Sequence, residues 1–179
     1  MARIPPANES SAPLASRELA AAHAASGGRM TNMKWTLAHS PVALDALLQW
    51  YPLRDAVLPL LGERTLWIFC HAISTQSECV ICSTFFRRLL VQSGEDPDRL
   101  ALDEWESAVV AFGRSLAVTP HVVPDPVYQP IAERLSREQI VVLTTFGALM
   151  VATNVFNNAV RVPLDEYLEP FRQAEERHG

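Results

Sequence analysis

The amino-acid sequence predicts an all-α fold, and three helix-start patterns are the main reason. Asp103 with Glu106, and Ser136 with Gln139, have the spacing of a capping box, in which two side chains bind the free N–H groups of a first turn. Ser40 before a proline is a third helix start. No segment shows the alternation of a half-buried strand, and no glycine-rich phosphate loop is present. A helical bundle is therefore expected.

Each expected helix has its own signal in the chain. Alanine-rich residues 16–25 stop at two glycines, and the stretch over 53–61 stops at Gly62. Residues 63–73 are densely apolar, which favours a buried helix, although a strand of that length has the same pattern. The polar run 74–77 is expected to break this element and to cap the next helix, which carries two cysteines. The expected helices are 16–25, 32–39, 41–51, 53–61, 63–73, 79–92, 103–116, 127–135, 137–160 and 163–171.

Length and composition predict one domain. The 179 residues, 49% of them apolar, are enough to bury a core. We expect a flexible leader with a short Ala-rich helix over 1–30, a single all-helical domain over 31–172 and a frayed tail over 173–179.

Charge and cysteine usage exclude several classes of function. A net charge of −5 without long basic runs gives no reason to expect a nucleic acid or membrane-surface partner. Three cysteines do not make a disulfide framework and the first residues do not resemble a secretory signal, so a cytoplasmic location is expected. Residues 139–160 are long and uncharged, but their Thr and Asn residues favour burial in protein over lipid.

The pair Cys79 and Cys82 carries the clearest chemical signal. Residues three apart share one face of a helix at about 5–6 Å between Cβ atoms, so a reversible disulfide is geometrically reasonable. Unsatisfied N–H groups and the positive end of the helix dipole favour a thiolate at the first turn. Two other interpretations stay open: a pair of small buried apolar side chains, and a metal site that adds Cys70 and His71. Adjacent ligands and missing knuckle spacing speak against the metal, and no cofactor is expected.

Three asparagines on the last long helix form a second polar cluster. Asn154, Asn157 and Asn158 stand at i, i+3 and i+4, on one face of an otherwise apolar helix. Buried amides must be hydrogen-bonded, so they either bind neighbouring backbone or line a polar pocket.

The chain resembles the carboxymuconolactone decarboxylase and alkyl hydroperoxidase D-like superfamily over roughly residues 30–170. Four features in order carry the resemblance: Ser40-Pro41, the segment 64–68, the Cys79-x-x-Cys82 pair, and 152–158 followed by Val162-Pro163. It implies an all-helical bundle with the dithiol at a helix N-terminus. It also implies that Cys82 attacks the substrate and that Cys79 closes the disulfide.

The residues that this family uses to relay protons differ here. A Glu on the preceding helix and two His residues are replaced by Trp67, Ile81 and Phe86. His71 and Glu78 are the remaining candidates for proton transfer, each with a plainer alternative as a core histidine and a solvated acid.

The expected function is thiol-dependent. The leading hypothesis is an alkyl hydroperoxidase-like or thiol–disulfide redox protein that takes a peroxide or a disulfide and is recycled by a partner dithiol. The alternative is a non-catalytic helical oligomer that has lost the relay. The resemblance and the uncharged last helix both imply a homo-oligomer, a trimer or hexamer by resemblance.

Overall fold

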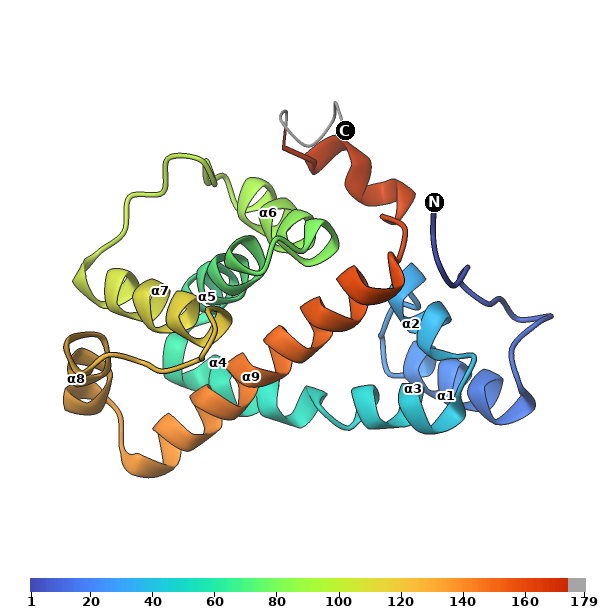
Figure 1. The fold of residues 1–179 in the computed structure, drawn as a ribbon, viewed down its shortest axis with the longest axis horizontal. Helices are drawn as coiled ribbons and strands as arrows, with labels where there is room; N and C mark the ends of the chain where they lie inside the picture. Colours follow the sequence, from blue (N-terminus) through green and yellow to red (C-terminus); the bar gives the residue numbers. More distant parts are fainter. Residues whose placement is uncertain (174–179) are drawn as a thin grey trace.

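The computed structural model describes residues 1–173, and within them the chain is all-helical, as predicted (Figure 1). The part of the expected frayed tail beyond residue 173 lies outside the described residues. The elements are α1 Leu14–Ala25, α2 Asn32–Leu37, α3 Pro41–Leu48, α4 Tyr51–Leu61, α5 Glu63–Gln76, α6 Val80–Gln92, α7 Glu104–Ala117, α8 Asp125–Arg134, α9 Arg137–Val160 and a 3-10 helix, η1, Glu166–Phe171.

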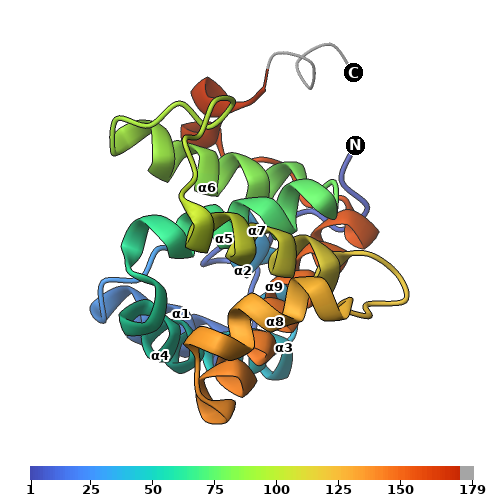
Figure 2. The ribbon, with the colours of Figure 1, turned by 90° about the vertical axis from the view of Figure 1, so that its left-hand side faces the viewer.

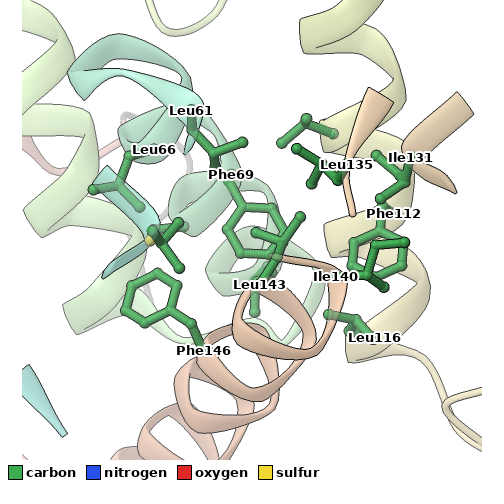
Figure 3. Close-up of a cluster of buried hydrophobic side chains, with 14 residues drawn as sticks. Leu61, Leu66, Phe69, Phe112, Leu116, Ile131, Leu135, Ile140, Leu143 and Phe146 are labelled. Atoms are coloured by element: carbon green, nitrogen blue, oxygen red, sulfur yellow. The ribbon is translucent and has the colours of Figure 1, made fainter. Parts of the chain in front are cut away.

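Helix α5 is the centre of the domain. It packs between α6 and α7, and α9 runs diagonally across the molecule to join α4, α5 and α7 with the C-terminal η1 (Figures 1 and 2). The main core forms where these helices meet (Figure 3). Its buried members are Val57, Leu61, Leu66, Phe69, Cys70, Ile73, Val109, Phe112, Leu116, Ile131, Leu135, Ile140, Leu143 and Phe146.

Two glycines let α7 and α9 approach α5 closely. A Cβ on Gly113 of α7 would lie 2.9 Å from the ring of Phe69, and a Cβ on Gly147 of α9 would lie 3.0 Å from the same ring. Both distances are shorter than ordinary carbon contacts, so there is no room for a Cβ atom and both positions favour glycine.

The predicted helix starts are confirmed by their hydrogen bonds. Asp103 accepts from the Glu106 amide at 2.8 Å, and the Glu106 carboxylate accepts from the Asp103 amide at 3.1 Å. Ser136 and Gln139 make the same reciprocal pair, at 3.3 and 2.8 Å. The Ser40 hydroxyl accepts from Ala43 at 3.4 Å, with Pro41 at the first helical position.

The sequence-based expectation for two segments is wrong. Residues 74–77 do not break α5, which continues to Gln76 because its inner face keeps packing: Ile73 and Ser74 are both fully buried. The last element is a 3-10 helix over Glu166–Phe171 rather than an α-helix from residue 163. Pro170, inside the expected helix, lacks the N–H group that a regular α-helix would use at that position.

The segment before α1, expected as a flexible leader, lies along the domain. The backbone N–H of Arg3 donates to the Val160 carbonyl at 3.0 Å, and its guanidinium donates to Ala159 at 3.0 Å. Further along, the Ala7 amide donates to Trp35 at 3.1 Å. The leader thus covers the C-terminal end of α9.

Helix α9 is long and unusually apolar. Its 24 residues include an 18-residue window of mean hydropathy 1.7, of which 33% is buried. By length and composition alone α9 could cross a membrane. The core helix of a soluble protein can have the same length and hydropathy, so a single helix of this kind is weak evidence for a membrane span.

Candidate functional site

The cysteine pair lies where α5 ends and α6 begins. Helix α5 ends in a Schellman motif: the Glu78 amide donates to Thr75 at 3.0 Å and the Cys79 amide donates to Ser74 at 2.9 Å. Glu78 has φ 51°, the left-handed conformation usual for glycine at this position. Cys79 is at once the last residue of this motif and the N-cap of α6.

This geometry corrects the expected helix start. The N-cap is Cys79 and not a residue of the polar run 74–77, and Cys82 falls in the first turn. Glu78 is therefore not a first-turn acid of α6. It lies one residue before the helix, because the tight reversal of the chain needs its left-handed backbone there.

Both thiols of the pair are reduced and buried. Cys79 is 1% exposed and Cys82 is 7% exposed. Cys70, the third cysteine, lies one helix away in the main core, and burial raises the pKa of its thiol far above its ordinary value. Burial therefore disfavours the thiolate of Cys70, which is the form that acts as a nucleophile.

The asparagines of α9 hold the turn that carries the dithiol. The Asn157 side-chain amide lies 3.3 Å from Cys82 Sγ and 3.7 Å from Cys79 Sγ, as a donor to both. Asn158 donates to the Ser77 carbonyl at 2.9 Å and Asn154 donates to Ser74 Oγ at 3.5 Å. The two alternatives for this cluster are thus combined: two amides bind the turn, and the middle one contacts the sulfurs.

The two thiols differ in acidity. The pKa of Cys79 is lowered to about 7, first because the Cys82 side chain hydrogen-bonds to it, and also by the amides of Cys82, Asn157 and Ile81, against the effect of burial. The pKa of Cys82 is raised well above its ordinary value, first because it donates to Cys79 and then because it is buried. Near neutral pH the pair can therefore hold one negative charge and one proton.

The structure does not connect His71 with the dithiol. Burial lowers the pKa of its imidazole to about 4, and the charge of Arg87 lowers it further, while Asp98 acts in the opposite direction. Arg87 and Asp98 form an ion pair with each other, and His71 lies near this ion pair. His71 therefore has the surroundings of a half-buried structural histidine.

Glu78 is close to the pair in sequence but not bound to it. Its side chain is exposed, and within residues 1–173 its carboxylate makes no hydrogen bond or ion pair.

The positions of the missing relay are apolar. Trp67 packs against the small cluster around Ile68 and Leu90, and Phe86 packs against the main core. Ile81 lines a shallow groove of about 320 Å³ beside the pair. The groove is lined by Val80, Ile81, Asn157, Asn158, Arg161 and Val162.

The described residues offer no group of three or more His, Cys, Asp or Glu side chains that could hold a metal ion. Cys70, His71, Cys79 and Cys82 thus do not converge on one centre in the part of the chain that the structure describes. A larger hollow of about 540 Å³ lies by α1 and Trp35 and contains none of the sequence-predicted site residues.

Asn157 is the site residue whose role could not be read from the sequence. The i, i+3, i+4 spacing placed it on the polar face of α9, but contact with the cysteines depends on how α9 crosses the α5–α6 turn. Asn157 is separated along the chain by 75 residues from Cys82 and by 78 residues from Cys79.

Fold and site together define an all-helical protein with a buried dithiol at a helix start. No family model and no curated protein sequence matches the chain. A crystal structure does: the alkylhydroperoxidase AhpD core of an uncharacterized peroxidase-related protein from Ralstonia eutropha JMP134. The match has a TM-score of 0.71 at 16% identity and covers 93% of this chain and 94% of that chain. The chain therefore has the alkyl hydroperoxidase D-like fold.

Proposed function

We propose that the chain is a thiol–disulfide redox protein or thiol-dependent peroxidase that works through Cys79 and Cys82. The observation that carries the proposal is one amide, Asn157, donating toward both sulfurs of a reduced pair at a helix start. A hydrogen-bond donor beside the sulfurs favours the thiolate, which is the reactive form of cysteine. The fold shared with a peroxidase-related protein supports the same class of chemistry.

The proposed reaction moves two electrons from the dithiol to the substrate. With a peroxide, one thiolate attacks an oxygen, the O–O bond breaks, and the leaving alkoxide takes a proton to become an alcohol. The second thiol then displaces water from the sulfenic acid, and a Cys79–Cys82 disulfide forms. A dithiol partner returns the pair to its reduced form by exchange. A cytoplasmic location, where thiols are kept reduced, suits this cycle.

The test is substrate consumption by the reduced protein with excess dithiol. Wild type is compared with Cys79→Ser and Cys82→Ser, and with Cys70→Ser as the matched control outside the pair. Loss of turnover in the first two variants and retention in the third is the expected result. A wild type that oxidises no faster than free cysteine would remove the proposal.

A second candidate is a non-catalytic helical assembly, and the outer face of α9 favours it. Exposed residues without charge recur along this helix at alternating spacings of four and three, as in a coiled-coil seam. They are Val141, Thr145, Ala148, Ala152, Val155 and Ala159. We propose that this seam pairs copies of the chain, whether or not the dithiol is catalytic.

Sedimentation measures the assembly. Wild type is expected to sediment as an oligomer, with a trimer or hexamer expected from the resemblance. Ala148→Glu combined with Ala152→Glu would bury two charges in the seam and should give monomers. Ala132→Glu, on the exposed face of α8, is the control and should leave the oligomer intact. A monomeric wild type would contradict the seam.

A further inference from the structure

The groove beside the dithiol has apolar walls and a positively charged end. Its volume is about 320 Å³, and its lining residues are Val80, Ile81, Asn157, Asn158, Arg161 and Val162. Asn157 joins the groove to the pair, because its amide nitrogen lies 3.3 Å from Cys82 Sγ and 3.7 Å from Cys79 Sγ. A small molecule in the groove is therefore one side chain away from the sulfurs.

Arg161 is the charged residue of this groove. Within residues 1–173 its guanidinium makes no ion pair and no hydrogen bond. Its backbone has φ 53° and ψ 55°, the left-handed conformation in which a helix usually ends on glycine. Any other side chain is strained in this conformation. The chain thus keeps a strained arginine beside the groove at a position where glycine would fold more easily.

Positive charge gathers at this end of α9. A second arginine, Arg3, donates from its guanidinium to the Ala159 carbonyl at 3.0 Å and makes no ion pair with a carboxylate of the described chain. Attraction to the helix dipole accounts for cations here, but not for the left-handed backbone of Arg161. Glu78, the acid next to the pair in sequence, does not line the groove. The end of the groove therefore favours an anion.

The spacing between Arg161 and the dithiol suits a short substrate. Arg161 comes one turn after Asn157, and the Val162 amide still donates to the Asn157 carbonyl at 3.0 Å. One helical turn spans about 5.4 Å, which is the length of a short carbon chain. A guanidinium binds a carboxylate through two parallel hydrogen bonds. A carboxylate on a short apolar chain therefore matches both the charge and the length of the groove.

The surroundings of the pair favour a disulfide over a peroxide as the substrate. A peroxide releases an alkoxide, which needs a proton donor as the O–O bond breaks. The positions that the resemblance assigns to the proton relay hold the apolar side chains of Trp67, Ile81 and Phe86. A disulfide releases a thiolate, whose conjugate thiol has an ordinary pKa of about 8.5, and such a group leaves without this help.

We propose that the groove binds a small disulfide that carries a carboxylate, and that Arg161 selects this substrate. The proposal specifies the substrate of the proposed redox function and rests on that function. One thiolate of the pair bonds to a substrate sulfur, the substrate S–S bond breaks, and the released thiolate takes a proton from water. The other cysteine sulfur displaces the second substrate thiolate, which takes that cysteine's proton, and the Cys79–Cys82 disulfide forms. Two electrons pass to the substrate, which leaves as two thiols.

The test compares three small disulfides of different charge at pH 7. Dithiodipropionate carries carboxylates, hydroxyethyl disulfide is neutral, and cystamine carries ammonium groups. Oxidation of the reduced pair is followed by thiol trapping and mass mapping, which excludes Cys70. Each rate is divided by the rate of the same disulfide with free dithiothreitol, which removes differences in intrinsic reactivity. In wild type, the normalised rate for dithiodipropionate should exceed that for cystamine at least roughly tenfold, with hydroxyethyl disulfide between them.

Two variants assign the preference to one residue. Arg161→Gly removes the guanidinium and suits the left-handed backbone, so the variant should fold. Its preference for dithiodipropionate over cystamine should fall at least roughly fivefold. Arg137→Gln removes an exposed positive charge from the other end of α9 and should keep the wild-type preference. Equal normalised rates in wild type, or an unchanged preference in Arg161→Gly, would overturn the proposal.

The two proposals fail in different ways. The redox function fails if the pair reacts no faster than dithiothreitol with any of the three disulfides. The role of Arg161 fails if the pair reacts fast but without regard to charge. A charge preference that Arg161→Gly removes supports the groove assignment even where the absolute rates are low, because the ratio does not depend on them.

Discussion

Single residues at the α5–α6 turn determine how the dithiol is presented. Glu78 takes up the left-handed conformation that lets the chain reverse within one residue. Asn157, on α9, donates from its side-chain amide toward both sulfurs. Glu78 acts here through its backbone and Asn157 through its side-chain amide, so the presentation of the pair depends on backbone geometry and on one neutral amide.

Replacing Glu78 by glycine should stabilise the protein. A side chain costs about 1–2 kcal/mol in the left-handed conformation, and glycine avoids this cost, less its own loss of freedom on folding. We expect Glu78→Gly to raise the free energy of unfolding in urea by roughly 0.5–1 kcal/mol. Glu78→Ala removes the carboxylate but keeps the penalty, so an equal gain in the alanine variant would show that charge is the cause.

His71 should make stability depend on pH. Its pKa is about 4 in the folded protein against an ordinary value near 6.5, because burial and Arg87 disfavour the charged form. The folded state therefore binds fewer protons, and the stability present above pH 6.5 is lost as pH falls toward 4.

Urea unfolding between pH 7 and 4 measures this effect. The His71→Gln variant should lose part of the pH slope, of the order of 3 kcal/mol across that range. The exposed His39→Gln variant should keep the slope of wild type. Parallel curves for His71→Gln and wild type would contradict the assignment.

The helices show what could be read from the sequence and what could not. The starts at Ser40, Asp103 and Ser136 were predictable because a cap is a local interaction within four residues. The end of α5 was not, because burial of Ile73 and Ser74 by distant helices overrode a polar run. The cysteine pair was visible as a spacing, whereas its contact with Asn157 depends on tertiary packing.

Close packing of α7 on α5 predicts an unusual response at Gly113. Alanine normally stabilises a helix by about 1 kcal/mol relative to glycine. Here its Cβ would lie 2.9 Å from the ring of the fully buried Phe69, and overpacking typically costs about 1–3 kcal/mol. Gly113→Ala should therefore lower the free energy of unfolding. Phe69→Leu in the same chain should relieve part of the Gly113→Ala loss, and additive effects would contradict direct contact.

At the scale of the whole molecule, the dithiol is enclosed by three helices and borders a shallow groove. Cys79 and Cys82 are at most 7% exposed, so access depends on the size of the reagent. This enclosure fits a small oxidant better than a bulky aromatic disulfide.

Reaction rates with two reagents test the enclosure. The native protein should react with dithionitrobenzoate at least about tenfold more slowly than the urea-unfolded protein, because burial hinders a bulky reagent. The corresponding ratio for hydrogen peroxide should be much smaller. Mass mapping confines the comparison to the pair and excludes Cys70. Equal hindrance of both reagents would contradict selection by size.

The contact between Arg3 and the end of α9 joins parts of the chain 156 residues apart. During synthesis Arg3 emerges long before α9, so its contacts with Ala159 and Val160 form only after α9 has emerged, whereas Ala7 and Ala12 pack against the earlier helices α2 and α3. A fusion partner joined to the N-terminus would be carried to the same end of α9 that holds Asn157, so a purification tag placed there risks disturbing the dithiol.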